Sequence, residues 1–401
     1  MWFAGIDWAD SHHDVVVIDE TGRKIASLRI DHTQEGMRKL IAFLHEIAPL
    51  DQIACILETN HGLLITALLE ARLTLYPVNP KTVDRRRSAS GAKTDLIDAY
   101  LLAKHGRSEL ADLRKLEPDS MLVQELKTLT RDQDSLIQSQ TRLVNQLTAC
   151  LKEYYPVALQ LFAKLHQPST LLFLQTYPTP QQAQAASAEQ MAEVLRRAQH
   201  KTAEKVAAKI VEMLQQPALV ADPVTLRTKS RLMLALVAQL DPLVKQIAAY
   251  DKEISELFLT HADSPLFSSL PGAGKRLAPR LLAEWGDDQK RYADAPAAQA
   301  LAGTSPTPYE SGNYSKVHQR YACIKALRNA LHQFAWQSTM QEPWALGYYQ
   351  RKRKEGKSHS MAVRALANVW VRILFAMWIK KEAYQRTIFE DAQRLHATRA
   401  A

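Results

Sequence analysis

The sequence FAGIDWADSHHDVVVIDETGRKIASLRI, residues 3–30, decides the fold of the first part of this chain. It contains three short runs rich in apolar and β-branched residues, at 3–7, 13–19 and 24–30, and Glu20-Thr-Gly22 separates the second run from the third. Short runs of this kind bounded by turn residues are typical of β-strands joined by tight connections. The stretch therefore predicts a meander of three antiparallel strands.

The spacing of apolar residues changes after Thr33. Met37, Leu40, Leu44 and Ile47 recur every three or four residues, which is typical of one face of a helix. An apolar run at 53–57, a helical pattern at 61–71 and another run at 74–78 indicate a β-α-β unit. Three antiparallel strands before such a unit describe the α/β ribonuclease-H-like (resolvase-like) fold, which we expect over residues 1–112.

Four acidic residues occupy informative places in this domain. Asp7 ends the first strand and Glu58 follows the fourth, and in the expected fold these two strand ends are adjacent. Asp95 and Asp98 are three apart in a predicted helix, so they share one face. Carboxylate oxygens suit Mg²⁺ or Mn²⁺, and two such ions can stabilise both oxygens of a phosphoryl transfer. The alternative is that these acids are helix caps and turn formers.

The middle of the chain, residues 113–265, is predicted to be a helical, coiled-coil assembly region. Its first helix, at about 117–165, carries apolar residues with four-three spacing, the pattern of a coiled coil. The positions in this repeat are Leu122, Leu126, Leu129, Gln133, Leu136, Gln140, Leu143, Leu147 and Cys150. The partner is either a second copy or a neighbouring helix of the same chain. Further helices are expected at 187–216 and 227–259, with a kink or break at Pro242.

Residues 266–401 form a predicted, mainly α-helical third domain. It opens with Leu270-Pro-Gly-Ala-Gly274, Lys275 and Arg276, followed by a helical pattern to Trp285. Glycines before a helix allow backbone N–H groups to approach a phosphate. The segment therefore resembles one helix-hairpin-helix element, although an ordinary turn between helices has the same residues.

Ser311 is the candidate nucleophile of this domain. It precedes Gly312 in a segment expected to be an exposed loop, where the glycine leaves the hydroxyl accessible. Ser315 is the chief rival and Ser305 a lesser one. A serine hydroxyl needs a base or a metal for activation, and His318, the nearest histidine, is better explained as a surface or phosphate contact.

The charge of the chain indicates a polyanionic partner. The formal net charge is +9, and residues 311–401 contain sixteen Lys and Arg against five Asp and Glu. Basic clusters give salt-sensitive affinity for nucleic acid, whereas a solvated helix face is the alternative for the densest cluster. The predicted contacts are Lys275, Arg276, Lys316, Arg320, Lys325, Arg328, Arg351, Lys352, Arg353, Lys354 and Lys357.

Composition excludes several classes of protein. Uninterrupted apolar runs fall well short of the roughly 18 residues of a membrane span, and the N-terminus lacks the pattern of a secretory signal. Cys55, Cys150 and Cys323 fit neither a zinc knuckle nor a disulfide framework. We expect a cytoplasmic protein with reduced thiols and no membrane partner.

Taken in order, these motifs resemble the DEDD transposases of the insertion-sequence family one-ten. The likeness rests on Asp7, Glu58, Lys93-Thr94-Asp95-Leu-Ile-Asp98, Leu270-Pro-Gly-Ala-Gly274, Ala302-Gly303 and Ser311-Gly312. It covers the first hundred residues and the stretch from about 267 to 385.

The resemblance implies a DNA recombinase with a composite active site. It implies that Asp7, Glu58, Asp95 and Asp98 hold divalent metal and that Ser311 becomes covalently linked to DNA. It further implies a structured noncoding bridge RNA as guide, double-stranded donor and target DNA as substrates, and a homo-oligomer, a dimer or a tetramer in the synaptic complex. Base pairing would then choose the sequence while the protein binds shape and backbone.

Two other functions are open from the residues alone. A metal-dependent Holliday-junction-type nuclease would use the same carboxylates to activate water, without a covalent intermediate. An architectural nucleic-acid binder would use the acids only structurally. The Ser311-Gly312 segment favours the transposase, because a simple resolvase does not need it.

Overall fold

The computed structural model describes residues 1–79, 94–217, 219–312, 314–388 and 391. Lys93, which belongs to a motif named above, lies outside the described residues, as does Asn313, which follows the Ser311-Gly312 pair. The chain forms two compact units, Met1–Pro118 and Asp119–Ala401. The division into three domains stays a prediction.

The first unit is built on a five-stranded sheet of order β3-β2-β1-β4-β5. Its strands are β1 (Trp2–Trp8), β2 (His12–Ile18), β3 (Lys24–Asp31), β4 (Ile53–Leu57) and β5 (Thr74–Pro77). The first three strands are antiparallel, and β4 and β5 run parallel to β1. The predicted meander and β-α-β unit are therefore both present.

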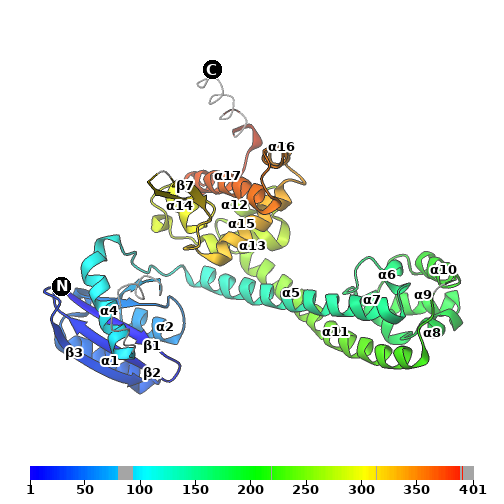
Figure 1. Ribbon diagram of the computed structural model, residues 1–401, viewed down its shortest axis with the longest axis horizontal. Helices are drawn as coiled ribbons and strands as arrows, with labels where there is room; N and C mark the ends of the chain where they lie inside the picture. Colours follow the sequence, from blue (N-terminus) through cyan, green and yellow to red (C-terminus); the bar gives the residue numbers. More distant parts are fainter. Residues whose placement is uncertain (80–93, 218, 313, 389–390, 392–401) are drawn as a thin grey trace. The chain divides into compact units, whose positions relative to one another are not determined.

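Helices cover both faces of this sheet (Figure 1). On one face lie α1 (Gln34–Ile47) and α2 (Leu63–Glu70), and on the other lies α4 (Asp95–Glu109). Thr33 caps α1 by accepting a hydrogen bond from the Gly36 N–H, as expected from its residue type. Short 3-10 turns occupy Leu50–Gln52 and Leu110–Asp112.

A long antiparallel helix pair runs through the second unit. It consists of α5 (Met121–Tyr154) and α11 (Pro223–Leu259) (Figure 1). Gln133 donates to Asp251 at 2.8 Å, and farther along α5 the Cys150 thiol donates to the Lys229 carbonyl at 3.4 Å. The four-three repeat of α5 is thus satisfied by a helix of the same chain, one of the two partners considered above. Pairing with a second copy stays a prediction.

Five short helices pack against the far end of this pair around their own core. They are α6 (Ala158–Leu161), α7 (Pro168–Thr176), α8 (Pro180–Ala185), α9 (Ala188–Arg197) and α10 (Ala203–Leu214). The single helix expected at 187–216 is wrong, because the chain leaves helical geometry at Gln199, whose φ is 56°. The first long helix ends at Tyr154, before Pro156, and α11 continues through Pro242 without a break.

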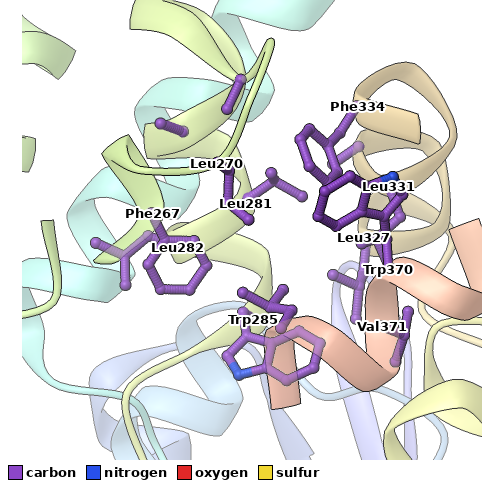
Figure 2. Close-up of a cluster of buried hydrophobic side chains, with 14 of the residues drawn as sticks. Phe267, Leu270, Leu281, Leu282, Trp285, Leu327, Leu331, Phe334, Trp370 and Val371 are labelled. Atoms are coloured by element: carbon purple, nitrogen blue, oxygen red, sulfur yellow. The ribbon is translucent and has the colours of Figure 1, made fainter. Parts of the chain in front are cut away.

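The rest of the second unit is mainly helical, as predicted. It comprises α12 (Ser264–Ser268), α13 (Gly274–Trp285), a 3-10 turn (Gln289–Arg291), α14 (Ala295–Leu301), β6 (Thr307–Ser311), β7 (Tyr314–His318), α15 (Lys325–Ser338), α16 (Pro343–Lys354) and α17 (His359–Lys380). Figure 2 shows its core, where Trp285, Phe334 and Trp370 pack among leucines of α13 and α15. The hairpin β6–β7 was not predicted.

Two of the described helices, α11 and α17, are long and apolar enough to cross a membrane by length and composition alone. Half of the α17 window is buried inside the protein, where Trp370 and Trp378 are fully enclosed. Core helices of soluble proteins meet the same criteria, so this finding is weak evidence of a span.

Candidate metal centre and hairpin serine

The alternation of side chains along the sheet brings three acids to one face. Residues of β1, β2 and β4 that pack on the α4 side include Phe3, Val16 and Ile56. Successive residues of a strand point to opposite faces. Asp7, Asp14 and Glu58 lie an even number of positions from those residues and so belong to the α4 face. Asp7 and Asp14 are also direct cross-strand partners.

Gly5 allows α4 to lie directly against β1. A Cβ at Gly5 would stand 1.9 Å from the Ala99 carbonyl oxygen and 2.5 Å from the Ala103 nitrogen, distances that real atoms do not tolerate. The first turn of α4 carries Asp95 and Asp98. The missing side chain therefore lets the helical acid pair approach the acids on the strands.

The pKa of Asp7 is shifted because these acids lie close together. Its pKa is raised from 3.8 to about 6, first by burial and then by the neighbouring carboxylates of Asp98, Asp95, Glu58 and Asp14. Like charges and burial both disfavour the ionised form of an acid. A divalent cation relieves both effects, and an all-oxygen donor set fits Mg²⁺ or Mn²⁺.

The sequence analysis missed two neighbours of these acids, Asp14 and Arg29. The Arg29 guanidinium contacts the buried Asp14 carboxylate through Nε at 3.0 Å and Nη2 at 2.6 Å, and Nη2 lies 3.6 Å from Asp95. His12 Nε2 lies 3.4 Å from the same Asp95 carboxylate. The ligand atoms of His12, Asp14 and Asp95 all lie within 4.8 Å of one another. Strand alternation in His12-His-Asp14 was the signal that could have revealed this set.

Ser311 belongs to the second unit, at the end of β6. The expected loop is in fact a β-hairpin, in which Ser311 pairs with Tyr314 across the turn. Gly312 has a φ of 55°, and no atom of the described residues lies within 4 Å of its Cβ position, so glycine suits this turn for its backbone conformation. Ser311 is exposed, as predicted.

The rival serines differ from Ser311 in their surroundings, although Ser315 is equally exposed. The Ser315 hydroxyl contacts the Glu310 carboxylate at 3.4 Å, and Ser305 is half-buried. Within the described residues, Ser311 has no side-chain hydrogen bond. His318 packs edge-on against Tyr309, with ring centroids 5.7 Å apart, and does not contact the serine in the described contacts.

Close packing requires glycine at one of the two glycine positions in the turn before α13. A Cβ at Gly272 would meet the Gln337 carbonyl group at 2.9 Å, whereas the space at Gly274 is open. Lys275 is exposed, and the Arg276 guanidinium forms a two-pronged ion pair with Asp251 at 2.8 and 2.9 Å.

The other basic candidates are spread over the hairpin, the helices α15 and α16, and the segments that follow the hairpin and α16. Lys316, Lys325 and Lys354 are exposed, whereas Arg320 and Arg328 are half-buried. In the cluster that ends α16, Arg351 lies over the Tyr348 ring, Lys352 pairs with Glu355 at 2.7 Å and Arg353 donates to the carbonyl of Lys357. Their contacts with nucleic acid stay predictions.

Comparisons with known proteins agree with these motifs. The family model for IS110 DEDD proteins, described as a transposase, matches residues 4–156, and the model described as transposase of the IS116/IS110/IS902 family matches residues 264–350. A mini-circle protein named as a transposase for IS117, from Streptomyces coelicolor, is 33% identical over 376 residues, which are 91% of each chain. This chain belongs to the IS110 family of transposases.

Two further relatives span nearly the whole transposase. A 42 kDa protein of insertion element IS900 from Mycobacterium paratuberculosis is 28% identical over 94% of this chain and 95% of its own. A 44.8 kDa protein of IS116 from Streptomyces clavuligerus is 29% identical over 95% and 96%. The matched regions of this transposase contain Asp7, Glu58, Asp95, Asp98 and Ser311. Transposases cleave and join DNA, so the chain is an enzyme of that class.

Proposed function

We propose that this transposase is guided by RNA and cleaves and rejoins donor and target DNA through a covalent serine–DNA intermediate. The observation that carries the proposal is the convergence on Asp7 of acids from β2, from the end of β4 and from α4, which raises its pKa. The sheet order β3-β2-β1-β4-β5 supports a ribonuclease-H-like domain around that point.

Asp7, Glu58, Asp95 and Asp98 would hold Mg²⁺ or Mn²⁺ in this proposal. When bound, the ions neutralise charge that develops on phosphate oxygens during strand cleavage. Among the described residues, the side chain of Asp95 is half-exposed, so a phosphate group could approach the acid cluster from that side.

The exposed Ser311 would be the nucleophile. Its Oγ forms a bond to phosphorus while the bond from phosphorus to one deoxyribose oxygen breaks. The hydroxyl proton leaves to a base, and the departing oxygen takes up a proton. Rejoining reverses this exchange when a deoxyribose hydroxyl attacks the serine ester.

The partners follow from the same proposal. They are a structured noncoding bridge RNA, double-stranded donor and target DNA, and further copies of this chain in a dimer or tetramer, in the cytoplasm and without a membrane. The basic residues predicted above would bind backbone phosphates, because a net charge of +9 favours polyanions.

Replacement of the nucleophile tests the mechanism. We expect Ser311→Ala to bind nucleic acid normally and to lose strand transfer by about 10³-fold or more, with no protein-linked DNA on denaturing gels. Ser315→Ala is the matched control and should keep the covalent product. If Ser311→Ala still cuts junction DNA at the parent rate, the chain acts instead as a metal-dependent nuclease that activates water.

A further inference from the structure

Three half-buried arginines of the second unit differ from their neighbours. Other half-buried arginines there face carboxylates at short distance: Arg280 with Asp134 at 2.9 Å, and Arg291 with Asp119 at 2.6 Å. Arg320, Arg328 and Arg364 are also half-buried, but no ion pair joins them to an acid in the described part of the chain. Burying a charge without a counter-charge is costly.

Two of these arginines gather around a histidine. Arg328 and His332 are one helical turn apart on α15, and Arg364 extends from α17. The pKa of His332 is lowered to about 4, first by burial and then by the charges of Arg364 and Arg328. Burial and Arg328 also lower the pKa of Arg364. Like charges therefore converge at this point from two helices.

Several nitrogen atoms of this group are buried without a hydrogen-bond partner. Within the described residues, these atoms are Nε of Arg320, Nε of Arg364 and Nε2 of His332. The Nη2 atom of Arg364 donates to the Gln319 side chain at 2.9 Å, which ties α17 to the segment after β7. Unsatisfied buried polar atoms are rare in folded proteins and call for an explanation.

We propose that Arg328, His332 and Arg364, together with Arg320, which directly follows the Gln319 that Arg364 contacts, form an anion site that binds a phosphodiester group of nucleic acid. An anion would supply both the missing counter-charge and acceptors for the unpartnered N–H groups. Arginine suits this ligand because its planar donors match phosphate oxygens. The inference rests on the proposed function, since nucleic acid is the polyanion of a transposase.

The site lies at the base of the hairpin that carries Ser311. Thr307 and His318 pair at that base, and Gln319 follows directly. Ser311 is four residues farther along β6, about 13 Å at roughly 3.3 Å per residue. A phosphate in the site is therefore not the one that Ser311 attacks. It is a flanking phosphate, and the four residues position the strand.

Binding measurements on the full chain test this site. Arg364→Gln and Arg328→Gln are compared with Arg227→Gln, which removes the same charge from an exposed position on α11. With a DNA duplex, we expect each site variant to bind about 5- to 10-fold more weakly and to lower the slope of log affinity against log salt by about one. Arg227→Gln should change neither quantity.

The melting temperature of the Arg364→Gln variant distinguishes a phosphate-binding role of Arg364 from a purely structural one. Because Arg364→Gln removes a cation that repels Arg328, it should leave the melting temperature unchanged or raised, whereas a structural arginine would lower it. In the unsubstituted chain, the Nε–H signal of Arg364 in ¹H–¹⁵N spectra should shift when the duplex is added, which tests the contact without any substitution.

A second binding experiment replaces the DNA duplex by an RNA hairpin. It shows whether DNA or RNA supplies the bound phosphate. Weaker binding of the variants to either polymer supports the site and assigns it to that polymer. Parent-like affinity and salt slope with both polymers overturn it while leaving the proposed function intact. If the unsubstituted chain binds neither polymer, both the site and the proposed function fall.

Discussion

The acid cluster depends on a few residues whose placement follows from simple geometry. Asp7, Asp14 and Glu58 share the α4 face because strand side chains alternate. Four of the acids were visible in the sequence as isolated carboxylates at element ends. Asp14 was not, because strand alternation places it on the same face as His12 but does not show that Asp7 and Asp95 lie beside that face.

Asp7 makes the stability of the metal-free protein depend on pH. Its pKa is about 6 in the folded chain against 3.8 in the reference state, so the folded state binds more protons between these values. Stability therefore falls as pH rises from about 4 to 6. Above pH 7, Asp7→Asn should raise the free energy of unfolding by at most about 3 kcal/mol, at 1.36 kcal/mol per pKa unit.

Urea unfolding in EDTA, from pH 4 to pH 8, measures this difference. The advantage of Asp7→Asn should grow between pH 4 and 6 and stay constant above. Mn²⁺ should then raise the stability of the parent chain at pH 8 and not that of the variant. A variant that is less stable than the parent at every pH would show that the Asp7 carboxylate is not strained by its neighbours.

At the level of elements, close contact between α4 and β1 positions the helical acid pair. Glycine is unusual inside a strand, because it has no side chain to pack and therefore weakens the strand. The reason is the backbone of α4, which occupies the space of a Cβ. The sequence shows the glycine but not the helix that approaches it, since α4 follows ninety residues later.

Gly5→Ala should separate α4 from the sheet. The new methyl group would meet the Ala99 carbonyl oxygen at 1.9 Å, and we expect a loss of about 1–3 kcal/mol or more and about tenfold weaker Mn²⁺ binding. Gly347→Ala is the control, because nothing lies within 4 Å of its Cβ position in α16; alanine should stabilise that helix by about 1 kcal/mol. Unchanged unfolding and Mn²⁺ titration in Gly5→Ala would contradict the packing argument.

Two other features of the fold were predicted less well, each for its own physical reason. The hairpin β6–β7 is exposed along nearly its whole length, so it lacks the apolar alternation that marks a strand. The four-three repeat of α5 identified an apolar face but not its partner, because a repeat is equally satisfied by any complementary helix. Only the folded chain shows that α11 covers it.

At the level of the whole molecule, the acids and the serine belong to different compact units. Asp7, Glu58, Asp95 and Asp98 lie in Met1–Pro118, and Ser311 lies in Asp119–Ala401. The positive charge is concentrated near the end of the second unit, with sixteen Lys and Arg against five acids over residues 311–401. Such a surface attracts polyanions at long range.

The proposed RNA guide can be tested by purifying the full chain with its bound nucleic acid. After expression together with the DNA flanking its gene, the chain should copurify with one defined RNA encoded beside that gene. Washing at about 1 M salt, where the Debye length is about 3 Å, should remove RNA held only by charge. Sequencing of the RNA that remains bound after the wash measures the outcome. Random fragments that disappear in this wash would leave electrostatic attraction without a guide.

The sequence by itself determined the strands of the first unit, the helical character of the second and the candidate acids and serine, because alternation and helical periodicity are local properties of the chain. Tertiary structure alone decided which helix covers α5, that Asp14 and Arg29 join the acid cluster, and that like charges from Arg328 and Arg364 meet at His332 with no ion pair to an acid among the described residues. These facts concern neighbours in space, and the burial that gives them their energy exists only once distant segments have packed together.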